Sequence, residues 1–156
     1  MGQPQFMPSS YLAFAQDFDG DGRRDIWKNE GDVFASIANY LAEHGWNSKT
    51  TWGRRVQAPS SLIVSLGNPS RRAAPGCRAK TSARKKLNAW QKLGVRRTDG
   101  TDLPTASLSA ALVLPDGQKG EAYLVYSNYA AIMAYNCAHL YALTVGMLAD
   151  RIGTVE

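Results

Sequence analysis

The sequence predicts a mainly helical α+β protein, and three segments indicate this class. Residues 31–44 place apolar side chains at helical spacing along one face, and residues 129–152 form a longer apolar stretch typical of a buried helix. Residues 108–115 and 121–127 have the composition of two strands, joined by a turn that contains Asp116-Gly117, a common hairpin signal. The expected fold is therefore a set of helices that carries a small β-hairpin.

Shorter elements are expected between these segments. Ser9 or Ser10 can cap a helix that runs to about Gln16, because a serine hydroxyl accepts a free backbone N–H. Residues 50–56 favour a short strand, and residues 87–93 favour a short helix that buries Leu87, Trp90 and Leu93. The basic, proline-containing segment 68–86 lacks apolar periodicity, which predicts a solvated loop.

Composition limits the possible partners of the protein but does not identify its function. The chain of 156 residues has a net charge of +5, which suits an anionic partner such as nucleic acid, a membrane surface or a cell-wall polymer. Two cysteines do not make a disulfide framework, so we expect unpaired thiols. A polar segment follows Met1, so we expect no export signal. Polar residues interrupt the uncharged stretch 129–149, so we expect a buried helix and no transmembrane segment.

An acidic loop is the clearest chemical motif. Four aspartates occupy loop positions one, three, five and nine, and they are Asp17, Asp19, Asp21 and Asp25. Glycine occupies position six, and Arg23 at position seven can offer its backbone carbonyl. This spacing is that of an EF-hand calcium loop, in which alternate side chains converge on one ion. Position twelve is Lys28 where an EF-hand has glutamate. A solvated acidic turn is the alternative, but four neighbouring carboxylates favour a bound cation.

Several motifs together resemble the membrane-bound lytic murein transglycosylase B family. They are GQPQFMPSSY, DFDGDGRRDIW, SIANYLAEHGW and the C-terminal NYAAIMAYN with LADRI, with weaker support from LNAWQKLGVRRTDGTDLP. The resemblance implies a lysozyme-like transglycosylase fold over residues 1–156, with an EF-hand-like loop at 17–32. Residues 58–86 match poorly, and both a divergent loop and a local reading-frame error would explain this.

The resemblance also implies site residues. Asp32 matches the family's last calcium ligand, so the expected metal site comprises Asp17, Asp19, Asp21, the carbonyl of Arg23, Asp25 and Asp32, with structural calcium. Five residues match the family's sugar-binding cleft, and they are Gln5, Tyr40, Tyr135, Asn136 and Tyr141. Core packing is an equal alternative for Tyr40, and a buried Asn136 would need a partner for its amide.

The family's reaction is non-hydrolytic cleavage of the MurNAc-GlcNAc β-1,4 bond of peptidoglycan, which leaves a 1,6-anhydromuramoyl end. A single glutamic acid serves as acid and base. The chain resembles the portion after that residue, and Glu30, Glu43, Glu121 and Glu156 do not match the family's catalytic segment. We therefore assign no catalytic residue and expect no cleavage by this chain alone. The family is periplasmic, and its partners are peptidoglycan glycan strands.

Two other functions are alternatives to this one. A non-catalytic, calcium-stabilised fragment that binds glycan or serves a structural role fits the same residues. Nucleic-acid binding would use the basic run, which comprises Arg71, Arg72, Arg78, Lys80, Arg84, Lys85 and Lys86. That run has no interleaved aromatic residue on which bases could stack, so no nucleic-acid partner is expected.

Overall fold

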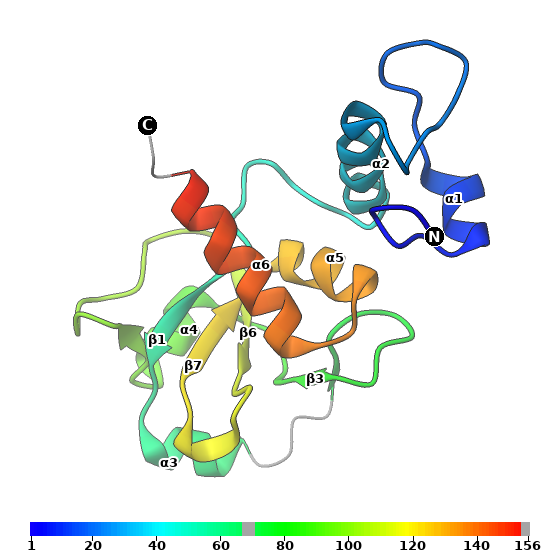
Figure 1. Ribbon diagram of the computed structural model, residues 1–156. Coiled ribbons are helices and arrows are strands. Elements are labelled where there is room, and N and C mark those ends of the chain that lie inside the picture. Colours follow the sequence, from blue (N-terminus) through cyan, green and yellow to red (C-terminus); the bar gives the residue numbers. More distant parts are fainter. Residues whose placement is uncertain (67–70, 154–156) are drawn as a thin grey trace. The chain divides into compact units, whose positions relative to one another are not determined.

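The computed structural model describes residues 1–66 and 71–153. Contacts within the chain divide it into two compact units, unit 1 (Met1–Trp46) and unit 2 (Asn47–Glu156) (Figure 1). Among the described residues no single helix is long and apolar enough to cross a bilayer. The pair Ser127–Tyr135 and His139–Ile152 meets that test by length and composition, with a bend of 119° between its helices.

Two helices form most of unit 1. Helix α1 (Pro8–Phe14) begins at a proline, a residue suited to the first helical position, so the predicted serine cap is wrong and both serines lie inside the helix. Helix α2 (Glu30–Glu43) confirms the predicted helix to within a residue at each end. Asn29 caps α2, because its side-chain oxygen accepts the backbone N–H of Gly31 at 2.9 Å.

Hydrogen bonds join the end of α1 to α2. The backbone N–H of Gln16 donates to the buried Ser36 hydroxyl at 2.9 Å, and the Asn39 amide donates to the carbonyl of Phe14 at 3.0 Å. Both α2 side chains lie on the helix face that also carries Asp32. The acidic segment between the helices is therefore anchored at both of its ends.

Unit 2 is built on a five-stranded antiparallel sheet in the order β4-β6-β7-β1-β5. Its strands are β1 (Gly53–Gln57), β4 (Lys85–Lys86), β5 (Arg96–Arg97), β6 (Ser109–Val113) and β7 (Ala122–Val125). A separate two-stranded sheet consists of β2 (Arg71–Arg72) and β3 (Lys80–Thr81). The predicted hairpin is confirmed as β6 and β7, joined through the short 3-10 helix η1 (Gly117–Lys119), and it forms the centre of the larger sheet.

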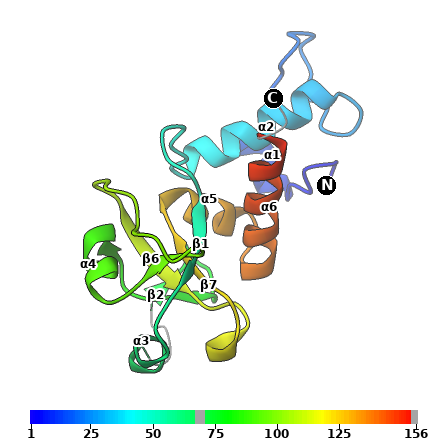
Figure 2. The same ribbon diagram turned by 90° about the vertical axis from the view of Figure 1, so that its left-hand side faces the viewer.

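Both faces of this sheet are buried. Along β7, Tyr123 and Val125 face one hydrophobic cluster, while Ala122 and Leu124 face another. Helices α5 (Ser127–Tyr135) and α6 (His139–Ile152) cover the first face, whereas α4 (Leu87–Lys92) and α3 (Ser60–Ser65) contribute to the second (Figure 2). Burial on two faces explains why both strands are apolar at almost every position instead of alternating.

The basic segment is more ordered than expected. Its described part, residues 71–86, contains β2, β3 and β4, so the predicted solvated loop is wrong there; residues 68–70 lie outside the described residues. Cys77 forms a disulfide with Cys137, sixty residues away, which corrects the expectation of unpaired thiols. The bond joins the β2–β3 hairpin to the connection between α5 and α6.

The predicted long helix 129–152 is two helices. α5 ends at Tyr135, Asn136 and Ala138 adopt extended backbone conformations, and α6 starts at His139. No glycine or proline marks this break in the sequence, so local pattern could not place it. The disulfide at Cys137 and the packing of both helices on one sheet face hold the bent arrangement.

Candidate functional site

The acidic loop brings three carboxylates together. One oxygen from each of Asp17, Asp19 and Asp32 lies within 4.8 Å of the others. Calcium binds oxygens at 2.3–2.6 Å, so two ligands on opposite sides of one ion are separated by twice that length, which is close to 4.8 Å. The three side chains therefore fit a shared calcium ion, with room in its coordination sphere for further oxygens.

Asp32 also organises the loop. Its side chain is fully buried, and its two oxygens accept the backbone N–H groups of Phe18 and Asp25, each at 2.7 Å. One carboxylate on α2 thus holds both ends of the loop. Its charge supports these bonds, since hydrogen bonds to an ionised acceptor are about twice as strong as neutral ones.

The other expected metal ligands make local hydrogen bonds. Asp21 accepts the N–H of Arg23 at 2.8 Å, and Asp25 accepts those of Trp27 and Lys28, each at 3.0 Å. Neither carboxylate belongs to the group formed by Asp17, Asp19 and Asp32. The structure thus gathers three of the six expected metal ligands.

Gln5 is the cleft candidate with unusual backbone geometry. Its φ of 53° lies in the left-handed region, and no other described non-glycine residue has a positive φ. The residue closes a turn in which its N–H donates to the carbonyl of Gly2 at 3.1 Å, and its side chain is exposed. Such conformations cost about 1–3 kcal/mol and cluster at functional sites, which supports a binding role for this glutamine.

Tyr40 lies in an aromatic cluster of unit 1. Its ring stacks on His44 at 4.0 Å between centroids and meets Phe14 edge-on at 4.8 Å. Phe6, the neighbour of Gln5, lies 5.7 Å from the same ring. Burial raises the pKa of Tyr40, whose side chain is half-buried. The ring therefore packs against its aromatic neighbours as a core residue would.

The remaining cleft candidates meet at the junction of α5 and α6. The Tyr135 and Tyr141 rings are stacked with 6.5 Å between centroids and 4° between planes. Asn136 lies between the helices with an exposed side chain, so the expectation that it is buried in a helix is wrong. An exposed amide beside two tyrosines can offer both a donor and an acceptor to a ligand.

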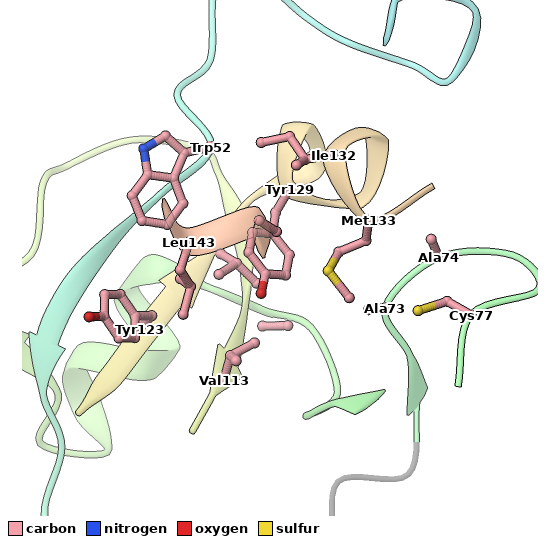
Figure 3. Packing of buried hydrophobic residues seen from close by; sticks show 13 residues of the cluster. Trp52, Ala73, Ala74, Cys77, Val113, Tyr123, Tyr129, Ile132, Met133 and Leu143 are labelled. Atoms are coloured by element: carbon pink, nitrogen blue, oxygen red, sulfur yellow. The ribbon is translucent and has the colours of Figure 1, made fainter. Parts of the chain in front are cut away.

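A buried network lies beneath this junction. Tyr129 is the central aromatic residue of the first cluster, between Leu143 and Met133 (Figure 3). Its hydroxyl lies 2.8 Å from Nδ1 of His139, whose Nε2 lies 3.0 Å from the carbonyl of Lys80. Since a carbonyl only accepts, Nε2 carries the proton and the Tyr129 hydroxyl donates to Nδ1. Burial lowers the pKa of His139 and raises that of Tyr129.

Sequence analysis missed two residues of unit 2. Asn128 is fully buried in α5, and its amide bonds the backbone of Asn47 and Thr50, which ties the start of unit 2 to this helix. His139 holds the β2–β3 hairpin through Lys80. Both residues are polar side chains within an apolar stretch of sequence. A polar side chain that is buried in such a stretch needs a hydrogen-bond partner, and this pattern could have identified them.

Charge is divided unequally between the units. Unit 1 contains three Lys or Arg and seven Asp or Glu, whereas unit 2 contains fifteen basic and six acidic residues. The described glutamates, Glu30, Glu43 and Glu121, are all exposed, and Glu121 pairs with Arg55. Glu156 lies outside the described residues. The net positive charge of the protein therefore resides in unit 2.

The comparisons with known proteins define the class of protein. The family model described as a transglycosylase SLT domain matches residues 1–150, so the chain belongs to this family. SltB3 from Pseudomonas aeruginosa, solved in complex with NAG-anhNAM-pentapeptide, is 42% identical with a TM-score of 0.84 over 99% of this chain and 38% of that one. The fold is therefore the lysozyme-like transglycosylase fold of the α+β class, as predicted.

A sequence and a solved structure from Escherichia coli are also similar to the chain. Membrane-bound lytic murein transglycosylase B (strain K12) is 29% identical over 152 residues, which are 97% of this chain and 37% of that protein. Lytic transglycosylase Slt35, solved in complex with calcium, is 26% identical with a TM-score of 0.71, over 100% of this chain and 45% of that one. The chain thus spans less than half the length of these relatives.

Proposed function

We propose that this chain binds peptidoglycan as part of a lytic murein transglycosylase. The observation that carries the proposal is the stacked pair Tyr135 and Tyr141 beside the exposed amide of Asn136. Tyrosine offers an apolar face to a sugar ring and a hydroxyl to its polar edge, and the carboxamide can bond an N-acetyl or hydroxyl group. Gln5 and Tyr40 contact the same kind of ligand from unit 1.

The parent reaction is cleavage of the MurNAc-GlcNAc β-1,4 bond with a 1,6-anhydromuramoyl product. Its acid must be a carboxyl group that stays protonated near neutral pH, which requires burial in an apolar site. Glu30, Glu43 and Glu121 are exposed and do not have this environment. We therefore propose that the chain by itself binds peptide-bearing glycan strands without cleaving them, which is the function of a non-catalytic glycan-binding module.

The Cys77–Cys137 disulfide supports a periplasmic site of action, because disulfides persist in oxidising compartments and are rare in the cytosol. Calcium is proposed as a structural cofactor held by Asp17, Asp19 and Asp32, with Asp21, Asp25 and the Arg23 carbonyl available as further ligands. The ion would neutralise adjacent carboxylates and stabilise the connection between α1 and α2.

The test is a binding and cleavage assay with purified sacculi. The 156-residue chain should co-sediment with sacculi and with peptide-free glycan strands, and it should release no anhydromuropeptides. Failure to bind either material would contradict the binding function. Release of anhydromuropeptides would contradict the proposed inactivity and direct attention to the glutamates.

A further inference from the structure

A small cavity of about 270 Å³ lies in unit 2, between the β2–β3 hairpin and the start of α5. Its lining includes the guanidinium-bearing Arg72 and Arg84, the hydroxyl-bearing Thr81 and Ser82, and Tyr129. No carboxylate contributes to the lining. The Tyr135–Asn136–Tyr141 site does not include these residues, so the cavity is separate from the glycan-contacting groups.

Arg84 makes the cavity electropositive. Its guanidinium donates to the carbonyls of Ser109 at 3.2 Å and Tyr126 at 3.1 Å, and partial burial lowers its pKa. Within the described part of the chain no acidic side chain forms an ion pair with Arg72 or Arg84. A guanidinium group whose hydrogen bonds go to neutral carbonyl groups is stabilised when an anion binds beside it.

The hydroxyl groups of the cavity already use their protons within the protein. Thr81 donates to the carbonyl of Ser82 at 3.1 Å, and Ser82 donates to that of Ala83 at 3.0 Å. The Tyr129 hydroxyl donates to His139, as the tautomer assignment requires. The side-chain donors left for a ligand are guanidinium N–H groups, so the complementary ligand is an anion whose oxygen atoms only accept.

The walls of the cavity are preorganised. The Cys77–Cys137 disulfide joins the hairpin to the end of α5, and the backbone N–H of Ser82 donates to the carbonyl of Leu112 in β6 at 3.1 Å. His139 additionally holds the carbonyl of Lys80. A cavity with fixed walls loses little conformational entropy when a ligand enters it.

We propose that this cavity binds a carboxylate carried by a peptidoglycan stem peptide. The inference rests on the proposed function, which puts the chain on peptide-bearing glycan strands whose peptides carry free carboxylates. The cavity is slightly smaller than the usual ligand site of about 300–1,000 Å³, so it accommodates a single carboxylate-bearing group and not a whole peptide. Planar guanidinium groups match planar carboxylates in geometry as well as in charge.

The test measures affinity of the full chain by calorimetry for four probes. They are the free stem pentapeptide, the same pentapeptide with its carboxylates amidated, inorganic phosphate and a peptide-free glycan strand. The free pentapeptide should bind, and amidation should weaken binding at least about tenfold, since charge-assisted hydrogen bonds are lost. Equal affinity for the free and amidated peptides would overturn the proposal. Phosphate that binds more tightly than the free peptide would also overturn it, in favour of a phosphate site.

Three variants make the test specific. Arg72→Gln should weaken pentapeptide binding about tenfold, and Ala83→Trp, which changes no charge, should do the same by filling the cavity. Lys119→Gln removes a comparable exposed charge from η1 and should leave binding unchanged. Equal effects of Arg72→Gln and Lys119→Gln would show non-specific attraction and refute the site. Arg84 is left intact because it holds two backbone carbonyls.

The glycan probe separates this inference from the proposed function. The three variants should bind peptide-free glycan as well as the natural chain does. If the natural chain binds the pentapeptide through its carboxylates but does not bind glycan, the proposed function is contradicted and the cavity proposal is supported. Glycan binding without any pentapeptide binding would support the proposed function and overturn the cavity proposal.

Discussion

The rings of Tyr135 and Tyr141 lie parallel, with 6.5 Å between their centroids, although the helices that carry them meet at 119°. On one continuous helix, side chains six residues apart would point about 120° apart around the axis. The break at residues 136–138 therefore brings the two rings to one place and exposes Asn136 beside them. The candidate glycan site of unit 2 depends on that break.

Asn136→Ala should weaken glycan binding about five- to tenfold while changing the free energy of unfolding by less than about 0.5 kcal/mol. The side chain is exposed at the end of α5, so its removal leaves no buried group without a partner. Sedimentation with peptide-free glycan and urea unfolding measure the two quantities. Asn88→Ala, which removes an exposed amide from α4, is the control and should change neither. A stability loss above 1 kcal/mol with unchanged glycan binding would assign Asn136 a structural role.

Calcium should raise the melting temperature of the chain, because a ligand that binds only the folded state stabilises it by about 2.7 kcal/mol at a hundred times its Kd. Asp19→Asn should weaken calcium binding roughly tenfold or more, since it removes one charge from the three-carboxylate group. Glu43→Gln removes an exposed charge outside the loop and is the matched control. A calorimetric titration without heat at millimolar calcium would exclude the site.

Gly146→Ala should destabilise unit 2 by about 1–3 kcal/mol. A Cβ atom at this position would overlap the Trp52 ring, against which α6 packs. The same indole is held by its N–H, which donates to Asp150 at 3.0 Å, so the ring cannot move away freely. Thr144→Ala, at an exposed position of α6, serves as the reference in urea unfolding. Equal stabilities of the two variants would mean that α6 does not pack on Trp52 as described.

The stability of unit 2 should fall as the pH drops from about 7 toward 5. Burial lowers the pKa of His139 below its ordinary value near 6.5, so the unfolded chain takes up a proton at a higher pH than the folded one. The stabilisation is fully present above the unfolded pKa and is lost as pH falls through the folded pKa. Melting temperatures at pH 7.5 and 5.5 measure the effect, and His139→Gln should reduce the difference. An unchanged difference in the variant would assign the pH dependence to other groups.

Local patterns were enough to predict much of the fold. The apolar stripe of residues 31–44 depends on neighbours along the chain, and α2 follows the prediction closely. The hairpin of β6 and β7 was likewise set by short-range turn chemistry. The spacing of Asp17 and Asp19 is also local, and the structure brings their oxygens together with Asp32.

Other features depend on contacts between distant residues. Strands β4 and β5 contain two residues each, too few to show a pattern, and exist because longer strands pair with them. The Cys77–Cys137 bond spans sixty residues, and the break between α5 and α6 has no glycine or proline to announce it. The sequence alone determined the elements whose stability comes from near neighbours. The tertiary structure decided where the long apolar segment bends, because only packing on the sheet and the disulfide select that geometry.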